Sequence, residues 1–213
     1  MTERFSAIVF DVDGVLVDSE PLHAWAWREV LTRYGVEAEP GEIDQFIGIP
    51  CTVMLKYFQD RVGDRLPDTA VDEKQVLFDR VMEERLTPME GAPAVVRALH
   101  SRGIPLAAAS NSPAPRVRRM LSSIGISTCF SAIAGIDEVS AGKPAPDVYL
   151  LACERLGVAP GRCLAVDDSP TGIASAAAAG LTVLGYAHDF SAEVLQEAGA
   201  DAVIRSLSEV LCI

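Results

Sequence analysis

Short apolar runs that alternate with helix-length segments constrain the fold of this chain more than any other feature. Six of these runs have the length and composition of buried parallel strands: Ala7–Phe10, Pro105–Ala109, Ala132–Gly135, Cys163–Val166, Thr182–Leu184 and, more weakly, Ala202–Ile204. Helical patterns lie between most of them; Pro93–Arg102, for example, starts with proline and is followed by Gly103. Strands that alternate with helices predict an α/β protein with a doubly wound parallel sheet.

The interval between the first two strands is longer than a crossover requires. A βαβ crossover needs about a dozen residues, and the helix at Pro93–Arg102 already supplies it. The surplus segment is too long for a bare loop and contains its own helical patterns, at Leu22–Tyr34, around Ile43, at Thr52–Val62 and at Asp72–Leu86. We therefore predict a Rossmann-like core, residues 1–15 and 87–213, with an inserted α-helical cap domain, residues 16–86. This cap follows the first strand, so it would cover the edge where open α/β sheets bind ligands.

Charge and cysteine content limit the classes of partner. The formal net charge of −12 disfavours binding to nucleic acid or to anionic membranes. The negative net charge is still compatible with a small anionic substrate, because a bound cation can make the electrostatic potential of a pocket positive. The five cysteines never occur in Cys-x-x-Cys spacing, which predicts reduced thiols. Because we find neither a secretory pattern nor an uninterrupted apolar stretch of membrane-spanning length, we expect a soluble, cytoplasmic protein, and by default a monomer.

A carboxylate-rich turn, Asp11-Val12-Asp13-Gly14, directly follows the first strand. The strand end places Asp11 at the edge of the sheet, and Asp13 can reach the same space across the turn. Asp and Gly are also ordinary turn residues, so the tetrapeptide alone favours a plain turn over a functional site by about two to one.

A hydroxyl-rich segment, Ser110-Asn111-Ser112-Pro113, follows the second strand and opens a helix near Pro115. Hydroxyls and free N–H groups at a helix start form an anion-binding site. The same residue types are favoured as ordinary helix caps, so this segment alone fits both interpretations.

Two charged clusters follow the later strands. Gly142-Lys143-Pro144 can present one fixed positive charge to phosphate oxygens. Asp167-Asp168-Ser169 directly follows a buried strand, and adjacent carboxylates there require a nearby cation. Hard oxygen ligands of this kind favour Mg²⁺. All four clusters would meet at one edge of the sheet. A shared functional site explains this arrangement better than coincidence does.

Together the four clusters resemble the four motifs of the haloacid dehalogenase superfamily. The matching segments are Asp11–Glu20, Ser110-Asn111, Gly142–Asp147 and Val166–Ser169, and their order and spacing agree across nearly the whole chain. The helical insertion resembles the cap of the branch that contains β-phosphoglucomutase, phosphoglycolate phosphatase and sugar-phosphate phosphatases. This resemblance implies a Mg²⁺-dependent phosphatase that hydrolyses a small phosphate monoester, such as a sugar phosphate, through an aspartyl-phosphate intermediate.

The resemblance also implies roles for the four aspartates. Asp11 would be the nucleophile, and Asp13 would be the general acid and base. Asp11, the main-chain carbonyl of Asp13 and Asp168 would hold Mg²⁺. Asp167 would contribute to the metal site directly or through a water.

A further set of residues would bind the phosphate and the substrate. Lys143 and Ser110, with the N–H groups around Asn111 and Ser112, would stabilise the transferring phosphoryl oxygens. His23 lies where members of this branch place a histidine at the cap hinge. A packed histidine on the first cap helix is an equally good interpretation of that residue.

Two alternatives to hydrolysis remain open. The first is a β-phosphoglucomutase-like phosphotransferase. In that group the cap carries a pattern similar to Gly-x-Ser-Arg, whose arginine binds the distal phosphate. Here the counterpart is Gly48-Ile49-Pro50-Cys51, which lacks that cation, although Lys56 or Lys74 could replace it. A non-catalytic phosphometabolite-binding protein ranks lower, because such a protein could dispense with Asp11 or Asp13 and both are retained.

Overall fold

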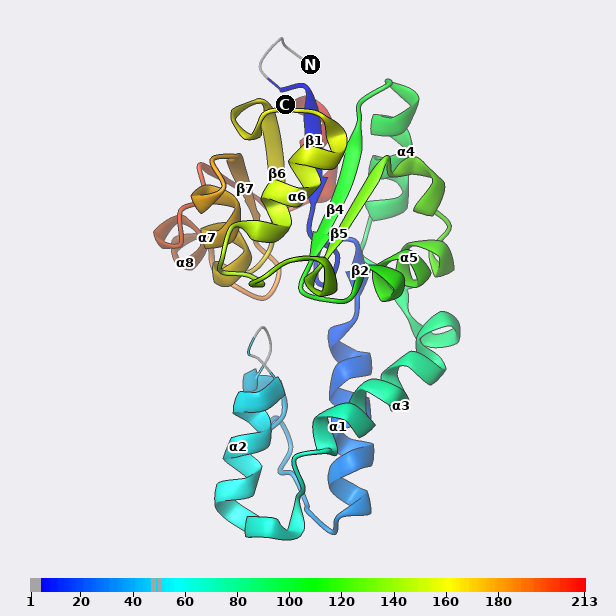
Figure 1. Cartoon of the computed structure of the whole chain (residues 1–213), viewed down its shortest axis with the longest axis vertical. Coiled ribbons are helices and arrows are strands. Elements are labelled where there is room, and N and C mark those ends of the chain that lie inside the picture. Colours follow the sequence, from blue (N-terminus) through cyan, green and yellow to red (C-terminus); the bar gives the residue numbers. More distant parts are fainter. Residues whose placement is uncertain (1–4, 47–48, 50) are drawn as a thin grey trace. The chain divides into compact units, whose positions relative to one another are not determined.

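The computed structural model describes residues 5–46, 49 and 51–213, and the chain divides into two compact units. Unit 1 comprises Met1–Asp18 with Thr87–Ile213, and unit 2 comprises Ser19–Leu86 (Figure 1). The motif predicted at residues 48–51 is only partly covered, because Gly48 and Pro50 lie outside the described residues.

A six-stranded sheet forms the centre of unit 1, in the order β5-β4-β1-β6-β7-β8. Every neighbouring pair is parallel, which confirms the predicted α/β class and the doubly wound sheet. The strands are β1 (Ala7–Phe10), β4 (Leu106–Ser110), β5 (Ala132–Gly135), β6 (Cys163–Asp167), β7 (Thr182–Tyr186) and β8 (Ala202–Ile204). Strand order reverses beside β1, and open α/β sheets bind their ligands at such a switch point.

Helices cover both faces of this sheet (Figure 1). Right-handed crossovers place α4 (Ala92–Ser101) and α5 (Ala114–Ser123) on one face. The same rule places α6 (Asp147–Leu156), α7 (Pro170–Ala178) and α8 (Ala192–Glu197) on the other. Short 3₁₀ turns complete the unit: η3 (Ser127–Cys129), η4 (Ile136–Glu138), η5 (Pro160–Arg162) and η6 (Leu207–Cys212).

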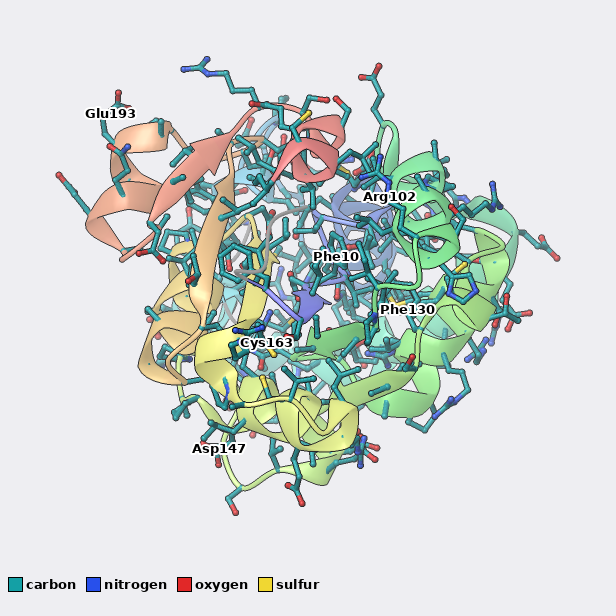
Figure 2. All side chains as sticks on the ribbon, turned by 90° about the horizontal axis from the view of Figure 1, so that it is seen from above. Phe10, Arg102, Phe130, Asp147, Cys163 and Glu193 are labelled. Carbon is teal, nitrogen blue, oxygen red and sulfur yellow. The ribbon has the colours of Figure 1, made fainter. Side chains whose placement is uncertain are left out.

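Strand alternation explains which residues meet α6 and α7. Small apolar residues at every second position form one buried face: Ala7 and Val9 on β1, Ala107 and Ala109 on β4, and Cys163 and Ala165 on β6. Phe10 lies on the opposite face and is fully buried; Figure 2 shows it in the middle of the side chains, far from Glu193 at the periphery. The next residues in phase with the α6 face are Asp11 and Asp167, so their side chains continue towards α6.

A small two-stranded ribbon in unit 1 was not predicted from the sequence. β2 (Val17–Asp18) pairs antiparallel with β3 (Thr87–Pro88), and the Met89 N–H donates to the Leu16 carbonyl at 3.0 Å. Two residues per strand are too few to show an alternating pattern. This ribbon lets the chain leave unit 1 and return to it at neighbouring points.

Unit 2 consists of helices, as the pattern of its residues predicts. They are α1 (Glu20–Arg33), η1 (Asp44–Phe46), α2 (Cys51–Val62), η2 (Gly63–Arg65) and α3 (Ala70–Arg85). Its interior contains Ala26 and Val30 of α1, Phe58 of α2, and Phe78 and Met82 of α3, all fully buried. The role of this unit as a cap stays a prediction.

No helix among the described residues combines the length and the apolar character that crossing a membrane requires.

Candidate active site

Lys143 connects two of the aspartates that follow the central strands. Its ammonium lies 2.7 Å from Asp11 Oδ1 and 2.8 Å from Asp167 Oδ2. The Lys143 side chain is only 5% exposed and that of Asp167 is fully buried, so solvent screens these ion pairs little. Asp11 and Asp167 are adjacent because β1 pairs directly with β6, with Phe10 opposite Val166.

Asn111 fixes the main chain of Lys143. The Lys143 N–H donates to Asn111 Oδ1 at 2.8 Å, and Asn111 Nδ2 donates to the Lys143 carbonyl at 3.3 Å. Gly142 leaves room for this arrangement, since a Cβ there would lie 2.5 Å from Asn111 Oδ1 and 2.2 Å from Ile136 Cδ1. The Asn111 side chain therefore binds the lysine loop, whereas the sequence had indicated only its N–H group for phosphate.

Asp13 lies beside the hydroxyl-rich segment after β4. Its Oδ2 accepts hydrogen bonds from Ser110 Oγ at 3.4 Å and Ser112 Oγ at 3.5 Å, which are long contacts. Ser110 Oγ also accepts from the Ser112 N–H at 2.9 Å. The second carboxylate of the first motif and the predicted phosphate-binding segment thus face the same space.

Gly14 is required by the turn and by its neighbour. Its φ of +78° is in the left-handed region, and its N–H donates to the Val17 carbonyl at 2.9 Å. A Cβ on Gly14 would lie 2.1 Å from Asp168 Oδ2. The second carboxylate of the Asp167-Asp168 pair is therefore packed directly against the turn that carries Asp11 and Asp13.

Three buried carboxylates form a candidate cation site. Asp11, Asp167 and Asp168 each offer an oxygen, and these atoms lie within 4.8 Å of one another. Buried carboxylates at such separations repel one another unless positive charge lies between them. The donor set consists of hard oxygens, so the residues fit a divalent cation.

The pKa values of the site follow from burial and from this surplus of negative charge. Burial raises the pKa of Asp11 to about 7; Lys143 opposes the rise, and the charges of Asp167 and Asp13 add to it. Burial also raises the pKa of Asp168 well above its usual range, reinforced by Asp167 and Asp11. Burial disfavours the charged form of Lys143, but Asp11 and Asp167 outweigh it and raise the pKa of the ammonium.

Tyr149 completes the surroundings of Asp167, and the sequence did not indicate it. Its hydroxyl donates to Asp167 Oδ2 at 2.6 Å, while the N–H and hydroxyl of Ser169 both donate to Asp167 Oδ1 at 3.0 Å. Tyr149 is fully buried on α6. An aromatic residue on the buried face of a helix gives a signal for packing, and only the structure reveals its hydroxyl contact.

His23 belongs to a separate cluster inside unit 2. Its Nδ1 lies 2.6 Å from Lys74 Nζ, and its ring stacks on Phe78 with 4.2 Å between centroids. Lys74 Nζ also donates to Cys51 Sγ at 3.7 Å. An ammonium therefore lies next to the cysteine that occupies the arginine position of the mutase-like pattern.

Comparison with known proteins gives consistent matches over most of the chain. Residues 5–180 match the family model described as haloacid dehalogenase-like hydrolase. The chain is 32% identical over 182 residues to the fructose-1-phosphate phosphatase YqaB of Escherichia coli (strain K12), across 85% of this chain and 96% of that protein. It is 30% identical over 204 residues to the phosphorylated carbohydrates phosphatase of Thermotoga maritima, across 93% and 94% of the two chains.

A solved structure gives similar agreement. It is a HAD family hydrolase of Deinococcus radiodurans R1 with bound phosphate and sodium, 32% identical to this chain. The two superpose with a TM-score of 0.80, across 98% of this chain and 94% of that one.

Proposed function

Because this chain belongs to the haloacid dehalogenase-like hydrolase family, we propose that it hydrolyses a small sugar phosphate or a similar metabolite with Mg²⁺ as its cofactor. The family and the phosphatase relatives identify the chain as an enzyme, a phosphoric monoester hydrolase. The observation that carries the proposal is the contact of Lys143 with Asp11 and Asp167, beside Asp168. The names of the relatives, which include phosphatases of fructose 1-phosphate and of phosphorylated carbohydrates, support the substrate class.

The first chemical step is assigned to Asp11. A carboxylate oxygen of Asp11 attacks phosphorus, the bond from phosphorus to the ester oxygen breaks, and an aspartyl-phosphate forms. Asp13 gives its proton to the departing oxygen, which leaves as an alcohol. Lys143, 2.7 Å from Asp11 Oδ1, favours the ionised form of the nucleophile and orients it.

The second step regenerates the enzyme. Asp13, now ionised, takes a proton from a water as that water attacks the phosphorus, and Asp11 leaves as a free carboxylate. The hydroxyls of Ser110 and Ser112 hold the Asp13 carboxylate beside the phosphate-binding segment. One carboxylate can serve both steps because it ends the first step in the form that the second step requires.

The phosphoryl oxygens are assigned to donors after β4 and to the lysine. Ser110 Oγ, the N–H groups around Asn111 and Ser112, and the Lys143 ammonium would stabilise the charge on these oxygens. The bound phosphate in the similar Deinococcus radiodurans hydrolase supports phosphate binding by this fold.

The cation site would be Asp11, the main-chain carbonyl of Asp13 and Asp168, with Asp167 acting directly or through a water. A Mg²⁺ ion held by these residues would neutralise charge that develops on the transferring phosphoryl group. The clustering of three buried carboxylate oxygens within 4.8 Å supports this assignment.

A phosphotransferase of the β-phosphoglucomutase kind is the second candidate, and one contact favours it. Lys74 Nζ lies 3.7 Å from Cys51 Sγ, so unit 2 does carry an ammonium near the position of the missing arginine. Lys74 is 1% exposed and bonded to His23, which ties this ammonium into the interior of unit 2. Hydrolysis stays the first choice, and a non-catalytic phosphometabolite-binding protein ranks third.

The proposal is tested by phosphate release from a panel of small phosphate monoesters that includes hexose phosphates and β-glucose 1-phosphate. Each reaction is run with Mg²⁺, with a chelator, and with the Asp11→Asn variant. Release that requires Mg²⁺ and Asp11 supports the phosphatase. Conversion of β-glucose 1-phosphate to the 6-phosphate with a bisphosphate primer, without phosphate release, would select the phosphotransferase. No reaction in either assay would favour the binding protein.

A further inference from the structure

Tyr149 lies directly behind the candidate active site, and the reaction steps above give it no role. It is fully buried, and its hydroxyl donates to Asp167 Oδ2 at 2.6 Å. The centre of its ring lies 5.0 Å from the Lys143 ammonium, within the range of a cation–π interaction. One side chain therefore contacts both the lysine and the carboxylate that share the active site with Asp11.

The position of Tyr149 follows from the fold. Helix α6 begins shortly after the loop of Lys143 and packs on β1, β4 and β5. Asp167 continues the alternation of Cys163 and Ala165, whose side chains face α6. A residue on the buried face of α6 thus meets the last residue of β6 at the edge of the sheet.

Packing explains the ring of Tyr149 but not its hydroxyl. Phenylalanine would fill nearly the same volume in this core, and it would avoid the cost of burying a polar group. That cost is offset only because the hydroxyl donates to a charged acceptor. The hydroxyl is therefore best explained by Asp167.

The bonds of Asp167 show what the hydroxyl adds. Its Oδ1 accepts two bonds from Ser169, and its Oδ2 accepts one from Lys143 at 2.8 Å and one from Tyr149. Each oxygen of Asp167 therefore accepts two hydrogen bonds, and together these donors hold the carboxylate in place. Without Tyr149, the charge on Oδ2 would face the Lys143 ammonium alone.

Lys143 is shared between two carboxylates at almost equal distances, 2.7 Å to Asp11 Oδ1 and 2.8 Å to Asp167 Oδ2. An Asp167 that lacks a second donor would draw the ammonium towards itself, because Coulomb attraction is strong in a buried site. The ammonium would then be less available to Asp11 and to the phosphoryl oxygens. A fixed Asp167 keeps the ammonium central.

We propose that Tyr149 is a positioning residue for phosphoryl transfer: by holding Asp167 Oδ2 with its hydroxyl, it keeps the Lys143 ammonium aligned with Asp11 and the phosphoryl group. This role rests on the proposed function. It acts through Lys143 and Asp167, and it requires no contact between Tyr149 and the substrate.

The Tyr149→Phe variant tests this role, because it removes the hydroxyl and keeps the ring. We expect kcat for phosphate release to fall about tenfold, because loss of one charge-assisted hydrogen bond would let the Lys143 ammonium shift away from Asp11 and the phosphoryl group. KM for the ester should change less than about threefold, because Tyr149 does not touch the substrate. The increase in melting temperature on addition of Mg²⁺ should remain, since Asp11 and Asp168 are unchanged.

Tyr34→Phe is the matched control, because Tyr34 also donates its hydroxyl to a carboxylate, that of Glu73, within unit 2. This variant should keep the wild-type kcat. Circular dichroism and the melting temperature of both variants show how much protein is folded at the assay temperature, and kcat is calculated for folded protein.

A kcat of Tyr149→Phe, calculated for folded protein, within about twofold of wild type would overturn the positioning role. Any loss of total activity would then come from a smaller folded fraction, and Tyr149 would serve stability alone. If the wild-type protein itself releases no phosphate from any ester, the proposed function fails along with this role, and the wild-type assay distinguishes this result from the first.

Discussion

At the scale of single residues, the chemistry of the site depends on how Lys143 is held. Asp11 and Asp167 bind the Lys143 ammonium, and the Oδ1 and Nδ2 atoms of Asn111 hold the Lys143 main chain. The charged residues could be predicted from the sequence because each one follows a recognisable strand. The partners that orient them, Asn111 as a main-chain anchor and Tyr149, could not, because their contacts depend on loops and helix packing.

Asp13→Asn removes the proposed acid and base while nearly preserving shape. We expect kcat to fall by about 10²-fold or more with an ordinary alkyl ester, because the leaving oxygen then departs without a proton. An aryl ester with a good leaving group should be less affected in the first step. Phosphate release from both esters measures this difference; a loss below about tenfold with the alkyl ester would remove Asp13 from the role.

The Asn111–Lys143 contact can be disturbed from either side. Asn111→Ala removes both hydrogen bonds, and Gly142→Ala places a Cβ 2.5 Å from Asn111 Oδ1. We expect each variant to lower kcat/KM about tenfold, and the double variant to lose less than the product, since both disturb one contact. Kinetics of the four proteins check this double-mutant cycle. Wild-type activity of Gly142→Ala beside a severe loss in Asn111→Ala would instead place the Asn111 side chain on the substrate.

At the scale of elements, the six strands of the main sheet and most helices could be predicted, but some of their ends differ in the structure. The second predicted strand, Pro105–Ala109, is β4 at Leu106–Ser110, so it includes the serine that meets Asp13. β6 likewise extends to Asp167, because that residue still pairs with Gly185 of β7. Polar residues at the end of a strand have the composition of a loop in the sequence. Only their pairing with a neighbouring strand shows that they belong to the sheet.

The junction of β5, η4 and α5 supports the phosphate-binding segment. The Ile136 N–H donates to the Ser112 carbonyl at 3.2 Å, and the Ala114 N–H donates to Asp137 Oδ1 at 2.7 Å. A Cβ on Gly135 would lie 2.2 Å from the Ala114 nitrogen, and a main-chain atom cannot move aside cheaply. The start of α5 is therefore set by close contact with the end of β5.

Gly135→Ala should destabilise this junction. We expect the free energy of unfolding to fall by about 1–3 kcal/mol, a typical cost of overpacking, and kcat/KM to fall as Ser112 shifts. Gly161→Ala is the control, because a Cβ there meets nothing within 4 Å, and it should change stability by less than about 0.5 kcal/mol. Urea denaturation measures both. Equal stability of the two variants would show that the junction can adapt without cost.

At the scale of the whole molecule, the buried carboxylates link stability to pH and to metal. Burial raises the pKa of Asp11 to about 7, so the metal-free folded protein keeps this proton to a higher pH than the unfolded chain does. The contribution of Asp11 to the free energy of unfolding is therefore fully present below about pH 4 and is lost as the pH rises towards about 7. Asp168, whose pKa is also raised by burial, acts in the same direction.

A divalent cation should reverse this loss. Because it binds the ionised carboxylates, we expect Mg²⁺ to raise the melting temperature more at about pH 8 than at about pH 5. Thermal denaturation at both pH values, with Mg²⁺ or a chelator, measures the shift. Asp168→Asn is the control and should lose most of it. An equal shift at both pH values would mean that Mg²⁺ binds outside this cluster.

The whole chain divides into two units, and unit 2 is the segment Ser19–Leu86. In the sequence, the corresponding feature is the excess of helical residues between the first two strands of the main sheet. Within unit 2, periodicity does not show which contacts His23 and Lys74 make. Their 2.6 Å contact and the nearby Cys51 emerge only when α1, α2 and α3 pack together.

The central claim is that Asp11 carries the phosphoryl group, and trapping that group tests it most directly. Wild-type protein is mixed with a substrate found in the panel, quenched with acid within the first turnovers, digested, and analysed by mass spectrometry with and without hydroxylamine. We predict one phosphoryl group on the peptide that contains Asp11, released by hydroxylamine as expected for an acyl phosphate, and absent from Asp11→Asn, which should be folded and inactive. Undiminished turnover by Asp11→Asn, or a phosphoryl group on a different residue, would contradict the account.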